Sequence, residues 1–388
     1  MENRAPSPAL VTSVASATLP MAVVTAFGFG MRIEGKLGLG VYCILMALCV
    51  AATRLRWVRT NVNAYVDFNS FSFGVSAFSS LVLLPLFQLG TPYSIYVETA
   101  VFVLATTLLA LSLTMWLAGL IDLGLAAYVG LGAYVSARLS MDLGCPLPLA
   151  LLGATLAGAA VAKLLSFPLL IVRGHYFSLA TLALGLFSYH VFVQSRSLTN
   201  GIDGIGNIPG FAVRGSNQVG HVQIGPVSFP YQIEPYYWTL FCFFIVFLFI
   251  RSLSKGQFAR CLQATRDNEP SAVSSGISVR RYRSWAYTIS GAVAGFSGAM
   301  YAHTVNYIAP GDFDLQRSVF FVMLAVLGGL GKPLPLVVSA SIMVFLEEKF
   351  REFGDLRLLL VALAILVVVL SRGYSSVDRS SSSSGCAT

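Results

Sequence analysis

The sequence predicts an all-α membrane protein, a polytopic helical bundle of roughly 8–11 spans with some short or broken helices and one helical hairpin outside the bilayer. Composition is the first observation. Of the 388 residues, 56% are hydrophobic and 11% are charged, and the mean hydropathy is +0.75, whereas soluble proteins carry about 25% charged residues. The second observation is that several apolar runs approach the ~20 residues that a helix needs to cross a bilayer. The third is that these runs do not alternate as the strands of a membrane barrel do.

Apolar runs along the chain supply the candidate spans. In chain order they are Leu10–Met31, Leu37–Ala52, Phe71–Leu89, Ile95–Leu117, Leu147–Val172, Tyr176–Val193, Tyr236–Ile250, Ser284–His303, Val319–Gly331, Leu334–Leu346 and Leu356–Leu370. The Gly- and Ala-rich piece Leu123–Ala137 is too short to cross alone, so it is either re-entrant or part of a broken helix. The stretch Gly328–Pro333 separates two further short runs. Short segments broken by Gly and Pro point towards a transport pathway, and a simple loop near the interface is the alternative.

Charge in the loops orients the bundle. The loop Gln194–Pro235 is charge-balanced, whereas Arg251–Arg283 holds seven basic residues against two acidic ones. Basic loops remain in the cytoplasm, so the second loop is expected inside and the first, one span earlier, outside. The same bias explains the net charge of +8 without a nucleic-acid partner. The Ser-rich tail, residues 373–388, lacks apolar periodicity and is expected to be disordered.

Motifs for catalysis or metal binding do not emerge from the sequence, so we expect a protein that is not an enzyme. It contains neither HExxH nor a phosphate-binding loop, and its scattered cysteines lack CxxC spacing. The run Gly295–Ala299 resembles a nucleophile elbow but ends in Ala. Small residues at helical spacing let two helices approach closely inside lipid, so the sequence favours helix packing here. The expected packing residues are Gly291, Gly295, Gly298 and Ala299.

Ionisable residues are rare at membrane depth, where a charge costs roughly 2.5–3.5 kcal/mol. They are Glu98, Asp122, Lys163, His190 and His303. Glu98 lies near the start of its apolar run and is expected at the interface, and the long stem of Lys163 lets its ammonium group reach the interface. Asp122 either lines a polar pathway or marks a short cytoplasmic turn, and the loop charges favour the turn.

The segment Gly256–Arg283 predicts two short helices. Gln257–Arg266 has a composition compatible with a helix, and the sequence Asp-Asn-Glu-Pro that begins at Asp267 supplies an N-cap and a first-turn proline for a second helix. Gly276 ends that helix. A connector of this length is more often functional than idle, and a charged helical hairpin is suited to docking another protein.

The second half of this segment carries a resemblance to a known family. RDNEPSAVSSGISVRRYRSWAYTISGAVAGFSGAMYAH, which begins at Arg266, resembles the cytoplasmic coupling segment and the following helix of the branched-chain amino-acid ABC importer permeases, a family that also contains urea-importer permeases. Further stretches agree with that family in the same order: DLGLAAYVGLGAYVSA, RGHYFSLATLALG, LTNGIDGIGNIPG and YIAPGDFDLQRSVFFVMLAVLGGLG. The resemblance covers residues 101–372, which are expected to form the permease domain, while residues 1–100 are expected to add membrane spans of unclear role.

The resemblance implies a multi-pass permease of the bacterial inner membrane, with no ATP site or cofactor of its own. It would move solute by alternating access and assemble with a second homologous permease subunit, two cytoplasmic ABC ATPase subunits that bind ATP and Mg, and a periplasmic or extracellular solute-binding protein. Carried over onto this sequence, the contacts that couple the permease to the ATPases fall on Arg266, Asp267, Asn268, Glu269 and Gly276.

The solute expected from the resemblance is a branched-chain or other apolar amino acid, because Arg173–Gly210 is similar to that branch of the family and the spans carry little charge. A urea or amide permease is one alternative. An ion-coupled secondary transporter is another, and it would need midplane carboxylates or histidines. The family usually has His where Leu125 stands and often an acidic residue where Leu186 stands. The residues predicted to face the pathway are Tyr128, Tyr134, Tyr176 and Thr181.

Overall fold

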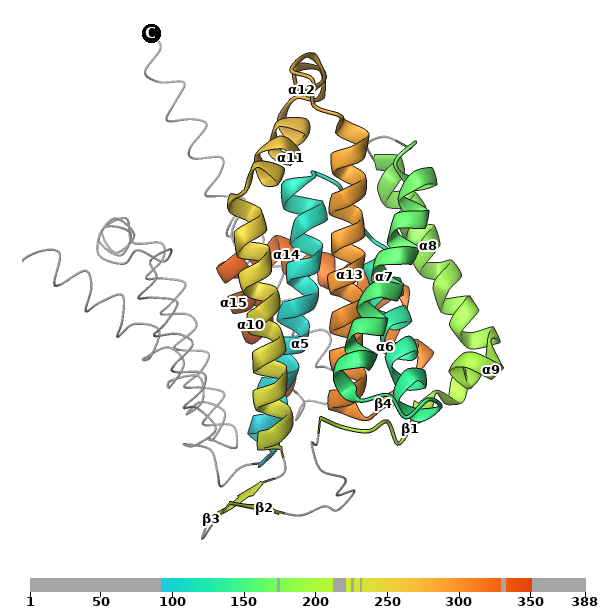
Figure 1. The fold of residues 1–388 in the computed structure, drawn as a ribbon, viewed down its shortest axis with the longest axis vertical. Coiled ribbons are helices and arrows are strands. Elements are labelled where there is room, and N and C mark those ends of the chain that lie inside the picture. Colours follow the sequence, from blue (N-terminus) through green and yellow to red (C-terminus); the bar gives the residue numbers. More distant parts are fainter. Residues whose placement is uncertain are drawn as a thin grey trace, which may run out of the picture. The chain divides into compact units, whose positions relative to one another are not determined.

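The computed structural model describes residues 92–172, 175–211, 221–224, 227–230, 232–328 and 333–350. Several predictions lie outside these residues: the spans Leu10–Met31, Leu37–Ala52, Phe71–Leu89 and Leu356–Leu370, most of the segment 1–100, and the tail 373–388. Helices dominate the described residues (Figure 1), and the predicted all-α bundle is confirmed.

The described elements are mainly helices. In chain order they are α5 (Pro92–Ser112), the π-helical turn η1 (Leu113–Leu117), α6 (Leu125–Met141), α7 (Leu147–Leu169), α8 (His175–Gln194), α9 (Arg196–Thr199), η2 (Gly201–Asp203), β1 (Ile205–Gly206), β2 (His221–Ile224), β3 (Val227–Pro230), α10 (Ile233–Lys255), α11 (Gln257–Asp267), α12 (Glu269–Ser274), α13 (Val279–Val305), β4 (Tyr307–Ile308), η3 (Pro310–Phe313), α14 (Leu315–Gly328) and α15 (Pro333–Lys349).

The chain divides into two compact units. The first unit, residues 1–96 and 218–233, includes β2 and β3, which pair as an antiparallel hairpin with His221 opposite Pro230. The second unit, residues 97–217 and 234–388, holds the helical bundle. All contacts described below lie within this second unit.

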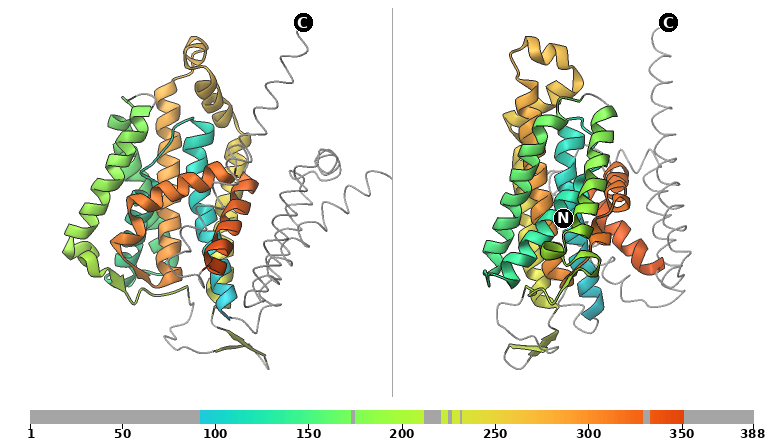
Figure 2. Two further views of the ribbon diagram at one scale, coloured as in Figure 1. Left: turned by 180° about the vertical axis from the view of Figure 1, so that it is seen from behind. Right: turned by 90° about the vertical axis from the view of Figure 1, so that its right-hand side faces the viewer.

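Helix length separates full spans from shorter pieces. Among the described helices, α5 together with η1, α7, α8 and α10 are long and apolar enough to cross a membrane. The Gly- and Ala-rich piece predicted over Leu123–Ala137 is a single helix, α6, of 17 residues. α14 has 14 residues, and it runs obliquely across the upright helices (Figure 2). Both are shorter than the ~20 residues of a full span.

Small residues bring α13 into close contact with α6 and α7. A Cβ atom at Gly295 would lie 2.6 Å from the carbonyl oxygen of Ala154 on α7. On α6, the backbone of Val129 occupies the space that a Cβ at Gly298 would need. α13 therefore packs backbone against backbone with both neighbours, as small residues allow inside a membrane.

On its other side α13 meets α5 through hydroxyl groups. The Ser297 hydroxyl donates to the Val103 carbonyl at 3.0 Å and lies 2.6 Å from the Thr107 hydroxyl. About two helical turns nearer the start of α13, the Ser290 hydroxyl donates to the Ala110 carbonyl at 2.8 Å. These bonds satisfy buried polar groups between two helices, where an unpaired group would be costly.

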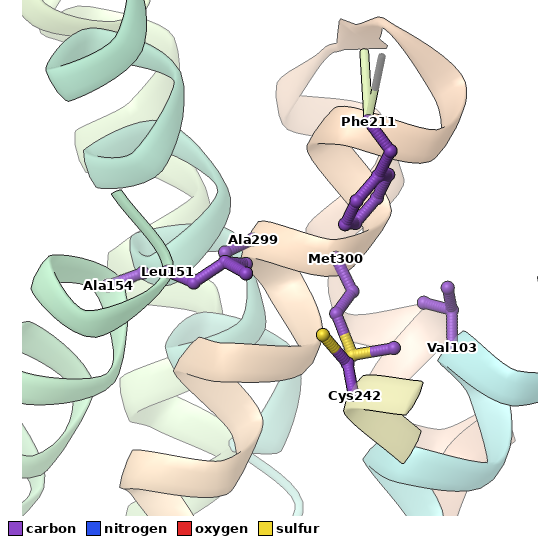
Figure 3. Packing of buried hydrophobic residues seen from close by; sticks show 7 residues of the cluster. All are labelled: Val103, Leu151, Ala154, Phe211, Cys242, Ala299 and Met300. Atoms are coloured by element: carbon purple, nitrogen blue, oxygen red, sulfur yellow. The ribbon is translucent and has the colours of Figure 1, made fainter. Parts of the chain in front are cut away.

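One apolar cluster joins four of the long helices (Figure 3). Ala299 and Met300 on α13 lie between residues of α7 on one side and residues of α5 and α10 on the other. The cluster consists of Val103, Leu151, Ala154, Phe211, Cys242, Ala299 and Met300. α13 is thus the central helix of the described bundle.

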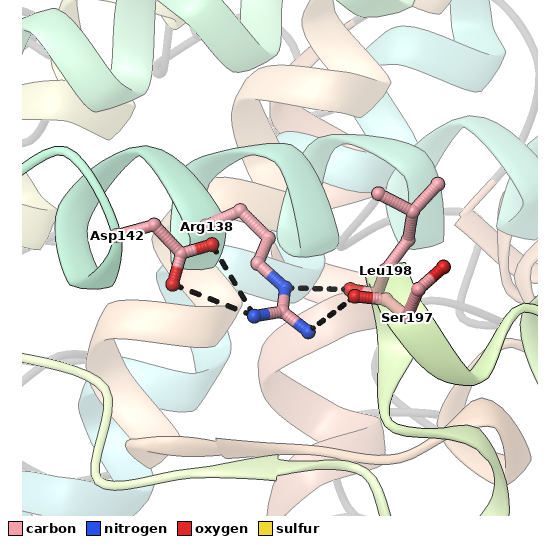
Figure 4. A network of polar contacts seen from close by, with 4 residues as sticks. All are labelled: Arg138, Asp142, Ser197 and Leu198. Carbon is pink, nitrogen blue, oxygen red and sulfur yellow. Dashed lines mark hydrogen bonds and ion pairs between the residues drawn. The ribbon is translucent and has the colours of Figure 1, made fainter.

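At the end of the bundle opposite the α11–α12 hairpin, an arginine fastens the loop that follows α8 (Figure 4). The Arg138 guanidinium donates to the carbonyl oxygens of Leu198 at 2.7 Å and Ser197 at 3.0 Å, and it pairs with Asp142 at 3.2 Å. Further along, β1 pairs with β4 in antiparallel register. Specific hydrogen bonds therefore hold the segment after α8 against α6 and β4.

Candidate functional site

The hairpin predicted over Gly256–Arg283 is present as α11 and α12, which project beyond the ends of the long helices (Figure 1). Asn268 separates the two helices in an extended conformation, and its side chain accepts a hydrogen bond from the Ser271 N–H at 3.1 Å. This is the N-cap that the sequence predicts. Gly276 then has φ +80° and nothing within 4 Å of its Cβ position. A left-handed residue of this kind ends α12, as expected for glycine.

Two arginines connect the hairpin to the helices of the bundle. Arg283, in the second turn of α13, pairs with Glu269 at 3.0 Å and donates to the Thr265 carbonyl at 3.3 Å. Arg266, in the last turn of α11, donates to the Trp116 carbonyl at 2.6 Å. The hairpin is therefore bonded to α13 through Arg283 and to the end of α5 through Arg266.

The end of α5 that receives Arg266 is irregular. The chain continues from α5 into the π-helical turn η1, where the Leu120 N–H donates to the Thr114 carbonyl at 2.8 Å. Gly119 follows with φ +69°, and the Arg266 side chain lies directly against it. π-helical turns are rare and frequently occur at functional sites. Arg266 thus binds α5 at its least regular point.

The five predicted coupling residues have different surroundings. Arg266 and Glu269 face their partners inside the chain, while the side chain of Asp267 is 65% exposed and pairs, within the described part of the chain, with its neighbour Arg266. Asn268 is used as the helix cap, and Gly276 lies in open space. The assignment of these residues to ATPase contacts stays a prediction, and the structure adds internal roles for four of them: Arg266, Asn268, Glu269 and Gly276.

Three aromatic rings from different helices meet inside the helical bundle. The Tyr128 hydroxyl on α6 donates to the Tyr287 hydroxyl on α13 at 3.0 Å. Phe177 on α8 packs edge-on against Tyr287, with ring centroids 5.9 Å apart. All three side chains are buried. Tyr128 was predicted to face the pathway, whereas the sequence analysis missed Phe177 and Tyr287, because a lone aromatic in an apolar run carries no distinguishing pattern.

Thr181 and Asp122 lie at the turn that precedes α6. The Thr181 hydroxyl accepts the Leu123 N–H at 3.1 Å, and both Thr181 and Asp122 are fully buried. One carboxylate oxygen of Asp122 accepts the Gly124 N–H at 2.9 Å, and the other has no hydrogen-bond partner among the described residues. Asp122 is therefore in a turn, as the loop charges favour, and yet is enclosed by protein. Glu98, which is expected at the interface, is also covered by protein, and its depth in the membrane stays a prediction.

The other two predicted pathway tyrosines differ sharply in exposure. Tyr134 is buried, and its ring packs against Phe192 and Phe313 at centroid distances of 5.1 Å and 6.0 Å. Tyr176 is 70% exposed at the start of α8. The structure does not bring Tyr176 to the buried aromatic cluster.

Two hollows flank α8. One of about 120 Å³ lies between α6, α7 and α8, with Tyr128 and Ser188 among an otherwise apolar lining. The other, of about 520 Å³, lies between α8 and the start of α14 and includes Leu186, Tyr189 and Asp314. Apolar walls with a few polar groups are typical of small-molecule sites. Among the described residues, three or more His, Cys, Asp or Glu side chains nowhere gather as a metal site would require.

Comparison with known proteins gives one family. The model of the branched-chain amino acid transport system permease component matches residues 95–370, and this match confirms the resemblance found in the sequence. The high-affinity branched-chain amino acid transport system permease proteins LivM of Escherichia coli K12 and Salmonella typhimurium LT2 are each 28% identical over 276 residues, covering 68% of this chain. The matched part spans 65% of each relative's own length. No solved structure matches the chain.

Proposed function

The chain belongs to the family of branched-chain amino acid transport permeases, and on that premise we propose that it is the transmembrane permease subunit of an ATP-driven ABC importer in a bacterial inner membrane. It is a multi-pass membrane protein. In the proposed assembly it pairs with a second homologous permease, two cytoplasmic ABC ATPase subunits and an external solute-binding protein. ATP and Mg are bound by the ATPase subunits.

The main support for this proposal is that the α11–α12 hairpin is bonded both to α13 and to the end of α5. The hairpin projects from the bundle at the end where basic residues gather, which is the cytoplasmic end by the positive-inside bias. A partner that displaces the hairpin also displaces α13 through Arg283 and α5 through Arg266. α5 and α13 line up side by side through Ser297 and Ser290. Movement at one end is thereby delivered to two adjacent helices of the bundle.

For the solute we propose branched-chain or other apolar amino acids. The LivM relatives are named as permeases for branched-chain amino acids. The hollow between α6, α7 and α8 is compatible with it, because its lining is apolar except for hydroxyl groups. Urea or another amide is the second candidate within the same family and would require polar contacts to carbonyl and amino groups along the path.

The test begins with the natural assembly. The tagged chain is extracted from its own membrane in mild detergent, and its partners are identified by mass spectrometry. Recovery of a second permease and of ATPases is the expected result. Reconstituted in vesicles with the binding protein, the assembly is then expected to accumulate radiolabelled leucine, and not urea, when ATP is supplied on the ATPase side.

The same vesicles separate ATP-driven import from ion-coupled transport. A protonophore added while ATP is held constant should leave leucine uptake unchanged. Uptake that collapses with the protonophore, or that proceeds in the chain purified without ATPases, would contradict the proposal and favour a secondary transporter.

A further inference from the structure

Two pairs of cations and aromatic rings lie along the seam between the end of α7 and the first turns of α13. The Lys163 ammonium on α7 is 4.6 Å from the ring centroid of Trp285 on α13. The Arg280 guanidinium on α13 is 4.9 Å from the ring centroid of Phe167 on α7. Lys163 and Phe167 are four residues apart, so the two pairs are stacked about one helical turn, or ~5.4 Å, along the seam.

Neither cation has a carboxylate partner among the described residues, where the ion pairs involve other arginines. Lys163 donates to the Ser284 hydroxyl at 3.0 Å, and Arg280 donates to the Phe167 carbonyl at 3.2 Å. An ammonium group has three donors and a guanidinium five, so both groups retain hydrogens for a further acceptor. Both residues are exposed.

An apolar stripe runs along α7 to this seam. Large apolar side chains that are 55–74% exposed recur every three or four residues, and Ala160 occupies the one intervening position of the series. The stripe consists of Leu149, Leu152, Leu156, Leu164 and Phe167. The opposite face of α7 is made of small residues that pack against α13. The stripe therefore faces away from the bundle and follows the helix through most of the membrane's thickness.

We propose that this seam binds the phosphate group of an anionic phospholipid of the cytoplasmic leaflet, with its acyl chains along the α7 stripe. The charges are complementary, since Lys163 and Arg280, which have no carboxylate partner in the described part of the chain, would face the headgroup layer. Aromatic rings such as Trp285 and Phe167 favour the interface between hydrocarbon and water. Basic pockets between helices on this side of a membrane are known to bind anionic headgroups. Because the seam joins α7 to the turn that follows the hairpin, the lipid holds the cytoplasmic end of α13 in place.

The test uses the full-length chain with its other tryptophans replaced by Phe, so that Trp285 alone reports on the seam. The chain is reconstituted in phosphatidylcholine vesicles that contain a minor fraction of brominated lipid, whose bromines quench nearby indoles. Each cation near the surface contributes about a fivefold preference for an anionic lipid. For two cations we therefore expect brominated phosphatidylglycerol to be enriched around Trp285 by about 25-fold over brominated phosphatidylcholine.

Variants decide whether the two cations cause the preference. Lys163→Ala combined with Arg280→Ala should bring the two lipids to nearly equal quenching, and each single variant should lose part of the preference. Lys163→Arg with Arg280→Lys keeps the charge and should keep the preference, which also controls for folding. Arg260→Ala removes an exposed cation from α11, away from the seam, and should have no effect.

Several outcomes would overturn the proposal. Equal quenching by both lipids in the parent chain would do so, as would an unchanged preference after both cations are removed. If inorganic phosphate in the aqueous phase abolished the stronger quenching by brominated phosphatidylglycerol, the seam would be assigned to a free anion. Photo-crosslinking from position 167 to another permease chain, in place of lipid, would assign the stripe to a protein interface.

Discussion

The α6–α7–α13 core and the α11–α12 hairpin are held by opposite kinds of contact. In the core, helix backbones touch at Gly295 and Gly298, and no side chain intervenes. The hairpin instead meets the bundle through the long side chains of Arg266 and Arg283. Packed backbones of this kind resist gradual deformation and move as a body. The polar contacts of the hairpin can be made and broken one at a time.

α13 contacts both the hairpin and the core helices, so it connects the two kinds of contact. Its first turns carry Arg283, which bonds the hairpin, and its middle carries the glycines that fix α6 and α7 to it. A displacement at the hairpin therefore enters a helix that cannot slip against its neighbours. We call the α11–α12 hairpin the soft region and the α6–α7–α13 core the stiff region. In the proposed importer, the soft region receives the movement and the stiff region carries it across the membrane.

The largest expected effect comes from filling the stiff region. Gly295→Leu places a side chain where the Ala154 carbonyl lies 2.6 Å from the Cβ position, and overpacking at a helix contact costs about 3 kcal/mol or more. We expect the variant to fail to assemble, as seen by size-exclusion chromatography in detergent. Gly311→Leu is the matched control, because a Cβ at Gly311 meets nothing within 4 Å. A stable and fully active Gly295→Leu protein would rule out the close-packed core.

A smaller effect is expected from breaking the ion pair of the soft region. Glu269→Ala removes the partner of Arg283, whose side chain is only 19% exposed. Leaving a partly buried charge unpaired costs about 1–3 kcal/mol, and the lower end applies because Glu269 itself is partly exposed. We expect leucine uptake to fall about tenfold while expression and complex assembly persist. Arg260→Ala, which removes an exposed charge from the same hairpin, should leave uptake near its original rate.

If Glu269→Ala transports normally, the Arg283 bond does not carry movement into α13. Glu269→Gln offers a graded comparison, because the amide can still accept a hydrogen bond from Arg283 but carries no charge. An intermediate uptake rate is expected for it.

The buried aromatic cluster joins α6 and α13 of the core to α8, and the hydrogen bond between its two tyrosines tests whether the cluster also faces the solute. Tyr128→Phe removes the bond to Tyr287 and one polar group from the wall of the 120 Å³ hollow. A single neutral hydrogen bond contributes about 1 kcal/mol. We expect a severalfold change in the ratio of leucine to valine uptake, measured by competition. Tyr176→Phe, at an exposed position, should leave that ratio unchanged, and equal ratios for both variants would remove Tyr128 from the pathway.

The smallest effect is expected at the cap between α11 and α12. Asn268→Ala removes the bond to the Ser271 N–H and should destabilise the hairpin by about 1 kcal/mol. Faster amide hydrogen exchange in α12, with the bundle helices unaffected, is the expected readout. Asn268→Asp, which can cap equally well, should restore protection. Unchanged exchange in Asn268→Ala would show that contacts with partners, and not the cap, hold the hairpin.

Much of this comparison could be predicted from the sequence. The apolar runs place the long helices, and the Asn-Glu-Pro sequence and Gly276 place the hairpin because caps and helix stops are local chemistry. The close spacing of Gly291, Gly295 and Gly298 shows that a helix contact exists. It does not show which helices make it, since that depends on residues far apart in the chain.

The polar contacts of the hairpin were beyond prediction for the same reason. The sequence predicts a partner-subunit contact for Arg266, but it gives no sign that its guanidinium also bonds the Trp116 carbonyl, 150 residues earlier in the chain. A backbone acceptor carries no sequence pattern. The burial of Glu98 was likewise missed, because proximity to the start of an apolar run says nothing about which neighbours cover a side chain.

The central claim is that the hairpin drives two helices at once, and Arg266 tests it most directly. The measurement is the number of leucine molecules imported per ATP hydrolysed by the reconstituted complex with Arg266→Ala. The account predicts that ATP hydrolysis continues and assembly is preserved while this ratio falls, because α5 is no longer pulled by α11. Arg266→Lys, which keeps a donor for the Trp116 carbonyl, should recover part of it. An unchanged ratio in Arg266→Ala would contradict the account, because coupling would then not depend on the contact between α11 and α5.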